Sequence, residues 1–323
     1  MKTNLLALLS LVLFVGSLGS NGCHGASQPL NKFPSGDHHF AIKIASLERK
    51  YVVHVPPSYD GTRPFPVVIM FHGGGGTAQA AMMETGWSTK ADQAGFLAVF
   101  PEATPPDMSK PGRFSTNPQT WNDGSGRFHS GRLNIDDVGF VNAMIDDLLS
   151  RFSVDERRIY ATGFSNGASM TYRVGAELSE RIAAIAPVSG HLWLKELELA
   201  RPVSLIYIFG ADDPLNPLEG GTVNLSRSAI SKRPPVVKSV LMWAEVLGCA
   251  LEPEVIYDHN GVKGVIYPQA RADSEVVFYT VDGLGHTWPG GQSLLPESMV
   301  GKTSTRLRAN DVIWEFFEKH PIR

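Results

Sequence analysis

Three residues able to perform nucleophilic catalysis occur in the order serine, aspartate, histidine, and each follows an apolar run. Ser165 lies between Gly163 and Gly167 in the stretch YATGFSNGAS, and Asp213 and His286 come later in the chain. A serine hydroxyl needs a base to become a good nucleophile, and histidine is the usual base near neutral pH. A carboxylate then holds the histidine ring in the required tautomer. This order predicts a catalytic triad for acyl transfer.

The two glycines around Ser165 have a physical reason. A G-x-S-x-G turn between a strand and a helix holds the serine in strained backbone, and a side chain two residues away would collide with the turn. The helix that follows favours negative charge near its first N–H groups. A turn of small residues is the structural alternative, but the position of Ser165 between an apolar run and a helical pattern favours a nucleophile.

A run of four glycines, Gly73 to Gly76, follows His72 at the end of another apolar stretch. Glycines let the backbone approach a substrate carbonyl closely. We expect an oxyanion hole made by the backbone N–H groups of Asn166 and of Gly74 or its neighbour, with Asn166 acting through its backbone. A phosphate-binding loop would need a Gly-Lys-Ser/Thr ending, which the run lacks.

The identity of the triad acid stays open from these residues alone. Asp212 and Asp213 are adjacent, and Asp282 lies in the same predicted loop as His286, too near to be its expected partner. His191 follows the stretch APVSG at a predicted strand end, so we expect it to line the pocket.

Alternating strand and helix patterns must position these residues. We expect strands at residues 39–46, 49–56, 65–71, 96–103, 157–163, 182–190, 202–210 and 275–283. We expect helices at residues 77–95, 136–152, 166–180, 234–248 and 309–320. Alternation of this kind predicts an α/β fold with a mainly parallel sheet and helices on both faces. Reactive groups then gather on the loops at the carboxyl ends of the strands.

The first residues have the pattern of a secretory signal peptide. Lys2 precedes an apolar stretch from Leu5 to Val15, which is too short to span a bilayer, and small residues follow. We expect a signal peptide at 1–22, a linker at 23–36 and one catalytic domain at 37–323. Cys23 falls where the signal peptide would be cleaved, so we expect either simple secretion or lipidation at Cys23. Lipidation is the only membrane contact that we expect.

Composition excludes some classes of function. The 323 residues carry a formal net charge of −3 without a basic block, so binding of nucleic acid has no electrostatic support. Two cysteines, Cys23 and Cys249, are too few for a disulfide framework. The loop at 104–133 is long and rich in Pro, Gly, Ser and Asn, which is typical of a functional loop.

The motifs together resemble a family of secreted esterases that includes polyhydroxybutyrate depolymerases and feruloyl or acetylxylan esterases. The resemblance runs from about Tyr51 to His320 and is carried by FHGGGGTAQAAMMETGW, NIDDVGFVNAMIDDLLSRF, YATGFSNGASMTYR and GHTWPGG. It implies an α/β-hydrolase fold and carboxylic ester hydrolysis without a cofactor or metal. It also implies Ser165 as nucleophile, Asp213 rather than Asp212 as acid and His286 as base.

The resemblance further implies that Trp121 and Trp288 line the substrate cleft. We therefore expect an exported serine esterase that cleaves feruloyl, acetyl or short hydroxyalkanoate esters, on small molecules or attached to polysaccharides. Two alternatives are an acyltransferase that uses the same acyl-enzyme and a non-catalytic carbohydrate-binding protein of the cell surface. Asn216 stands where the family usually has Val, and no separate substrate-binding domain is seen.

Overall fold

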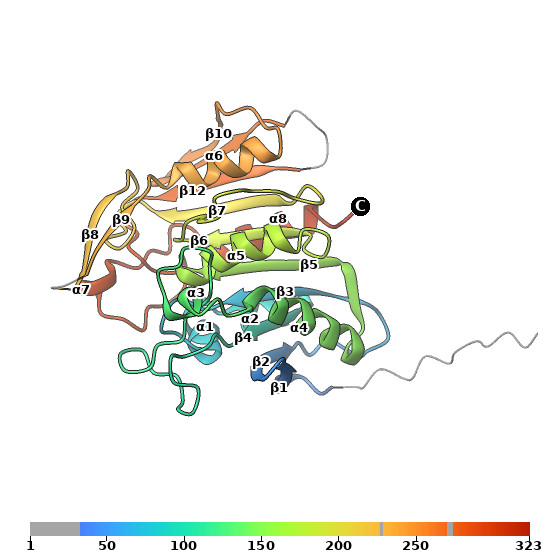
Figure 1. Cartoon of the computed structure of the whole chain (residues 1–323). Helices are drawn as coiled ribbons and strands as arrows, with labels where there is room; N and C mark the ends of the chain where they lie inside the picture. Colours follow the sequence, from blue (N-terminus) through green and yellow to red (C-terminus); the bar gives the residue numbers. More distant parts are fainter. Residues whose placement is uncertain (1–32, 227–228, 270–273) are drawn as a thin grey trace, which may run out of the picture.

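A ten-stranded sheet forms the centre of the computed structural model, which describes residues 33–226, 229–269 and 274–323 (Figure 1). Its strand order is β1-β2-β4-β3-β5-β6-β7-β12-β11-β10. The strands are β1 (Gly36–Ile44), β2 (Leu47–Val55), β3 (Phe65–Phe71), β4 (Leu97–Pro101), β5 (Val154–Phe164), β6 (Ala184–Val188), β7 (Ser204–Gly210), β10 (Glu254–His259), β11 (Val262–Tyr267) and β12 (Val276–Val281).

The six central strands, from β4 to β12 in the sheet order, run parallel, and two antiparallel strands close each edge. Every residue of β3 and β7 is buried, as expected for parallel strands that are covered on both faces. The predicted α/β fold with a mainly parallel sheet is confirmed.

Helices cover both faces of the sheet. One face carries α4 (Asp137–Arg151), α5 (Asn166–Glu177) and α6 (Val237–Val246). The other face carries α1 (Ala78–Thr85), α2 (Trp87–Ala94) and α8 (Ala309–Lys319). Two short helices, α3 (His129–Arg132) and α7 (Glu297–Val300), lie in the loops. Each face of the sheet therefore has its own hydrophobic core.

The single helix expected at 77–95 is wrong in one respect, because the structure divides it into α1 and α2. Gly86 has a φ of 69° and ends α1 in the left-handed region, where glycine is favoured. The Thr77 side chain accepts a hydrogen bond from the Ala80 N–H at 3.1 Å and caps the start of α1.

Several strands were not predicted. A hairpin of β8 (Gly221–Ser226) and β9 (Ala229–Arg233) forms a separate two-stranded sheet. β10 and β11 are joined by Asn260 and Gly261, both with positive φ, which is the two-residue turn typical of hairpins. β10 contains Val255, Ile256 and Tyr257, but these apolar residues are consecutive and exposed, so the strand lacks the alternating pattern on which a prediction could rest.

The predicted signal peptide, Cys23 and most of the predicted linker lie outside the described residues. Phe33 belongs to the packed structure, since its ring stacks on Phe152 with 4.4 Å between centroids. None of the helices in the described part of the chain has the length and apolar character that a membrane span requires.

The loops that follow the parallel strands meet at one end of the sheet. Figure 1 shows α3, α7 and the β8–β9 hairpin gathered there. This end carries the residues singled out by the sequence.

Candidate active site

Ser165 occupies the sharp turn between β5 and α5. Its φ of 56° and ψ of −116° place it in strained backbone that non-glycine residues rarely adopt. A Cβ at Gly163 would collide with the carbonyl oxygen of Gly167, and a Cβ at Gly167 would collide with that of Phe71. Both flanking glycines are therefore required by close backbone packing.

A continuous line of hydrogen bonds joins the three residues that the sequence singled out. His286 Nε2 lies 2.8 Å from Ser165 Oγ, and His286 Nδ1 lies 2.7 Å from Asp213 Oδ2. Because a carboxylate only accepts hydrogen bonds, Nδ1 carries the proton in the pair and leaves Nε2 to accept from the serine hydroxyl. The arrangement can move a proton from Ser165 to His286.

Asp213 is the aspartate that the structure places beside His286. Its other oxygen, Oδ1, accepts the backbone N–H groups of Leu215 and Asn216, both at 2.8 Å. The Asp213 side chain is fully buried. Asp212 and Asp282 are exposed, and neither contacts His286 among the contacts of the described residues.

The glycine run lies against the start of α5. The N–H of Gly75 donates to Gln119 O and the N–H of Gly76 donates to Gly73 O, so both are occupied. Gly74 lies beside Asn166, since a Cβ at Gly74 would be 3.6 Å from the Asn166 Cβ. In the described structure the Gly74 N–H has no hydrogen-bond partner, and Asn166 begins α5, where N–H groups have no partner within the helix.

His72 braces this loop. One ring nitrogen, Nδ1, contacts Gly73 O at 2.8 Å, and the other accepts the Ala103 N–H at 3.1 Å. Burial lowers the pKa of His72, so the ring stays neutral and can keep both contacts. These two contacts with backbone groups hold the start of the glycine run in place.

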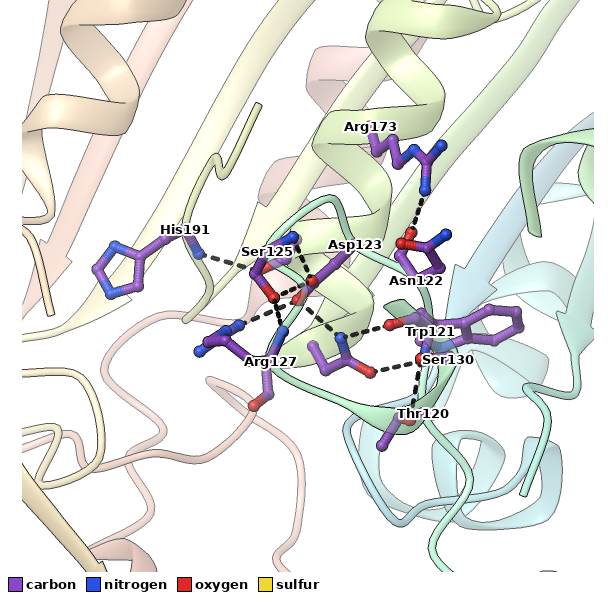
Figure 2. A network of polar contacts seen from close by, with 12 residues as sticks. Thr120, Trp121, Asn122, Asp123, Ser125, Arg127, Ser130, Arg173 and His191 are labelled. Carbon is purple, nitrogen blue, oxygen red and sulfur yellow. Dashed lines mark hydrogen bonds and ion pairs between the residues drawn. The ribbon is translucent and has the colours of Figure 1, made fainter. Parts of the chain in front are cut away.

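The Asn166 side chain has a task that the sequence did not reveal. Its Oδ1 accepts the Trp121 N–H at 2.8 Å, while its Nδ2 donates to Trp121 O at 3.2 Å and to Asp123 Oδ2 at 2.8 Å. These contacts belong to the network around Thr120–Arg127, in which Figure 2 labels Trp121 and Asp123. The amide thus fixes a long loop to the first turn of the helix that carries Ser165.

Trp121 lies beneath the cleft rather than in its wall, which corrects the expectation that it lines the cleft. The side chain is completely buried, and its Nε1 donates to His72 O at 3.0 Å. Its ring packs edge-on against Phe71. Trp121 therefore supports the glycine loop from below.

Two cavities meet at Ser165, and both are lined by Gly74 and His286. The larger, which we call the apolar pocket, has a volume of about 390 Å³. Its apolar wall includes Met70, Ala80, Phe114, Phe164, Trp288 and Leu295. Trp288 is held by a hydrogen bond from its Nε1 to Asn310 Oδ1 at 2.9 Å.

The second cavity, which we call the arginine pocket, has a volume of about 290 Å³. Arg127, His191 and Arg233 are among the residues that line it. His191 is buried, and burial together with the two arginines lowers its pKa to about 3. The two arginines were not singled out by the sequence, because they belong to a loop and to a hairpin outside the main sheet.

His129 lies away from both pockets and holds the long loop together. Its Nδ1 contacts Thr120 Oγ1 at 3.1 Å, and its Nε2 contacts Thr104 O at 2.8 Å. Among the described residues, no group of three or more His, Cys, Asp or Glu side chains could hold a metal ion.

Comparisons with known proteins agree with this architecture. A model of the phospholipase/carboxylesterase family matches residues 60–228. NocK of Nocardia uniformis subsp. tsuyamanensis, by its name an inferred esterase, is 28% identical over 295 residues, which cover 85% of this chain and 80% of NocK. Feruloyl esterase B of Piromyces equi is 27% identical over 252 residues, which cover 76% of this chain but 44% of that protein.

Two solved structures share the fold. An acetyl xylan esterase from Aspergillus awamori aligns with a TM-score of 0.53 at 16% identity, over 77% of this chain and 94% of that one. The protein pOPH aligns with a TM-score of 0.56 at 15% identity, over 93% of this chain and 90% of that one. The chain thus has the α/β-hydrolase fold.

Proposed function

The chain belongs to the phospholipase/carboxylesterase family of ester hydrolases, and we propose that it cleaves carboxylic esters through an acyl-enzyme on Ser165. The observation that carries the proposal is the line of hydrogen bonds from Ser165 through His286 to Asp213. In this proposal Ser165 is the nucleophile, His286 the general base and acid, and Asp213 the group that orients the ring.

The geometry supports a two-step reaction. His286 Nε2 takes the hydroxyl proton as Ser165 Oγ attacks the ester carbonyl, and Asp213 stabilises the imidazolium that forms. His286 then gives its proton to the departing alcohol, which leaves the acyl group on Ser165. Water attacks this acyl group with His286 as base, releases the acid and restores the serine.

The carbonyl oxygen needs donors while it carries negative charge. We assign the backbone N–H groups of Gly74 and Asn166 to this task, because they are adjacent and those of Gly75 and Gly76 are occupied. The loss of one such donor lowers kcat by about a hundredfold to a thousandfold in enzymes of this type.

The apolar pocket suits an aryl or short aliphatic portion of the substrate. Relatives are named as a feruloyl esterase and an acetyl xylan esterase. We extend these ester classes to this chain, with short hydroxyalkanoate esters as a further class, on small molecules or attached to polysaccharides. We also propose one catalytic domain at 37–323 and export through the segment at 1–22.

Labelling by a fluorophosphonate tests the nucleophile, and hydrolysis of p-nitrophenyl acetate tests the activity. The native protein is expected to show both, and Ser165→Ala is expected to lose both. The exposed Ser150 on α4 offers the control Ser150→Ala, which should keep them. Retention of labelling and hydrolysis by Ser165→Ala would overturn the proposal, and transfer of the acyl group to a sugar rather than to water would show an acyltransferase.

A further inference from the structure

Arg233 is a buried guanidinium without a carboxylate partner. It ends β9, and its side chain is 7% exposed. Its Nε donates to Leu215 O at 3.2 Å and its Nη1 to Ser231 Oγ at 2.5 Å, both neutral groups. No Asp or Glu among the described residues forms an ion pair with it. A buried charge without a counter-ion is unfavourable, so such a site favours an anion.

Other polar atoms of the arginine pocket also lack partners. His191 is 1% exposed, and neither ring nitrogen has a hydrogen-bond partner of regular geometry, although the Asn216 side chain lies near. Arg127 Nε is likewise buried without a partner. Figure 2 shows His191 and Arg127 at the same edge of the network, and both line the arginine pocket. Three side chains around one cavity thus have unused hydrogen-bonding capacity.

The acids nearest to these cations are already engaged. Asp123 accepts hydrogen bonds from Arg127 at 3.0 Å and from the Asn166 amide at 2.8 Å. Asp213 is bonded to His286 and to two backbone N–H groups. Burial and the Arg127 charge lower the pKa of Arg233 to about 10, so Arg233 is still protonated at neutral pH. The wall of the arginine pocket therefore carries two guanidinium groups and no Asp or Glu, while Asp123 and Asp213 act on Arg233 from outside that wall.

We propose that the arginine pocket binds a carboxylate of the ester substrate, with Arg233 as its main contact and Arg127 and His191 beside it. The inference rests on the proposed function, because the same pocket is lined by Ser165 and His286. The planar fork of a guanidinium matches a carboxylate in a bidentate fashion. The preferred substrate is then an ester that carries a second, free carboxylate on its acyl or its alcohol portion.

This inference separates the proposed substrate classes. A short hydroxyalkanoate oligomer ends in a free carboxylate, whereas an acetyl group on a neutral sugar has none. The apolar pocket would hold the uncharged portion on the other side of the scissile bond. The structure therefore favours oligomers of hydroxy acids over acetylated neutral sugars.

Two matched pairs of esters test the preference and locate the carboxylate. The mono-p-nitrophenyl ester of glutarate is compared with p-nitrophenyl butyrate for an acyl-side carboxylate. 3-Acetoxybutyrate is compared with its ethyl ester for an alcohol-side carboxylate. The carboxylated member should have a kcat/KM at least about tenfold higher in one pair, as expected for hydrogen bonds to a charged group. Ratios of one or less in both pairs would overturn the inference.

Variants then assign the preference to Arg233. Arg233→Gln should lower the ratio of kcat/KM values between the paired esters by about tenfold or more, chiefly through KM, and Arg233→Lys should restore part of it. The matched control is Arg63→Gln, which removes an exposed guanidinium outside both pockets and should keep the ratio. An unchanged ratio in Arg233→Gln would contradict the inference.

Inhibition of the native enzyme gives a test that needs no variant. 3-Hydroxybutyrate should compete with p-nitrophenyl butyrate more strongly than neutral 1,3-butanediol, and equal inhibition would count against the inference. Ser165-dependent hydrolysis of neutral esters without any preference for a carboxylate would refute this inference alone. Absence of labelling and of all ester hydrolysis would instead refute the proposed function.

Discussion

Asp137 and Asp213 are two fully buried carboxylates with similar surroundings and different partners. Asp137 pairs with Arg49 Nη2 at 2.7 Å and accepts the Asn122 N–H at 2.7 Å. Asp213 pairs with His286 Nδ1 at 2.7 Å and also accepts backbone N–H groups. Each carboxylate thus combines one side-chain cation or base with backbone donors.

The difference between the partners separates a structural task from a chemical one. Arginine is protonated at every physiological pH, so the Arg49–Asp137 pair can only hold its two segments together. Asp137 accepts the Asn122 N–H and so fixes the loop that also bonds to the Asn166 side chain through Asp123. Histidine exchanges protons near neutral pH, so a carboxylate beside it can support catalysis.

Replacement of the acid of the proposed triad should give the largest effect. Asp213→Asn is expected to lower kcat by about 10⁴-fold, because the amide no longer fixes the tautomer of His286 or stabilises its charged form. Esterase kinetics with p-nitrophenyl acetate measures this loss. The free energy of unfolding should change less than in Asp137→Asn, because His286 can stay neutral.

The neighbouring aspartate gives the control. Asp212 is exposed, and Asp212→Asn should change kcat little. An equal loss in both variants would contradict the assignment of Asp213 and the contrast with Asp137.

The second effect falls on stability. Asp137→Asn leaves Arg49, which is 3% exposed, as a buried charge without its partner. Loss of one member of a buried pair lowers the free energy of unfolding by about 3–5 kcal/mol. Urea unfolding measures the change. Asp146→Asn, at a carboxylate 64% exposed and paired with Arg181, is the matched control and should cost about 1 kcal/mol or less.

The third effect is a pH dependence at His191. Burial lowers its pKa to about 3, against about 6.5 in the unfolded chain. The unfolded state therefore binds the extra proton between these values, and stability falls as the pH falls. From pH 7 to pH 5 this should remove about 2 kcal/mol from the free energy of unfolding.

Denaturant unfolding of the native protein and of His191→Gln at both pH values measures this effect. The other titrating groups are shared, so the variant should lose about 2 kcal/mol less than the native protein over the same interval. Equal losses in the two proteins would show that His191 does not have a lowered pKa.

Ser165, an aspartate at 212 or 213 and His286 could be brought together from the sequence because each lies at or shortly after the end of a strand. The choice of Asp213 over Asp212 came from the family resemblance. Parallel strands end at the same edge of a sheet, so the order of apolar runs and loops carries spatial information. The same reasoning placed the glycine run at Gly73–Gly76 beside α5. Continuous apolar runs also predicted the central strands, since these strands are buried on both faces.

The arginine pocket could not be found in this way. Arg233 ends a small hairpin and Arg127 lies in an irregular loop, and neither segment has a periodic pattern that shows where it folds over the sheet. The loop position of Trp121 was visible, but sequence cannot distinguish a side chain in the wall of a cleft from one beneath it. The break at Gly86 was missed because helical patterns continue on both sides of it.

Identification of the acylated residue tests the central claim most directly. The protein is quenched in acid during the burst of p-nitrophenol release from p-nitrophenyl acetate, and its peptides are analysed by mass spectrometry. The proposed mechanism predicts an acetyl group on Ser165. An acetyl group on another residue, or a burst without acetylated protein, would contradict it.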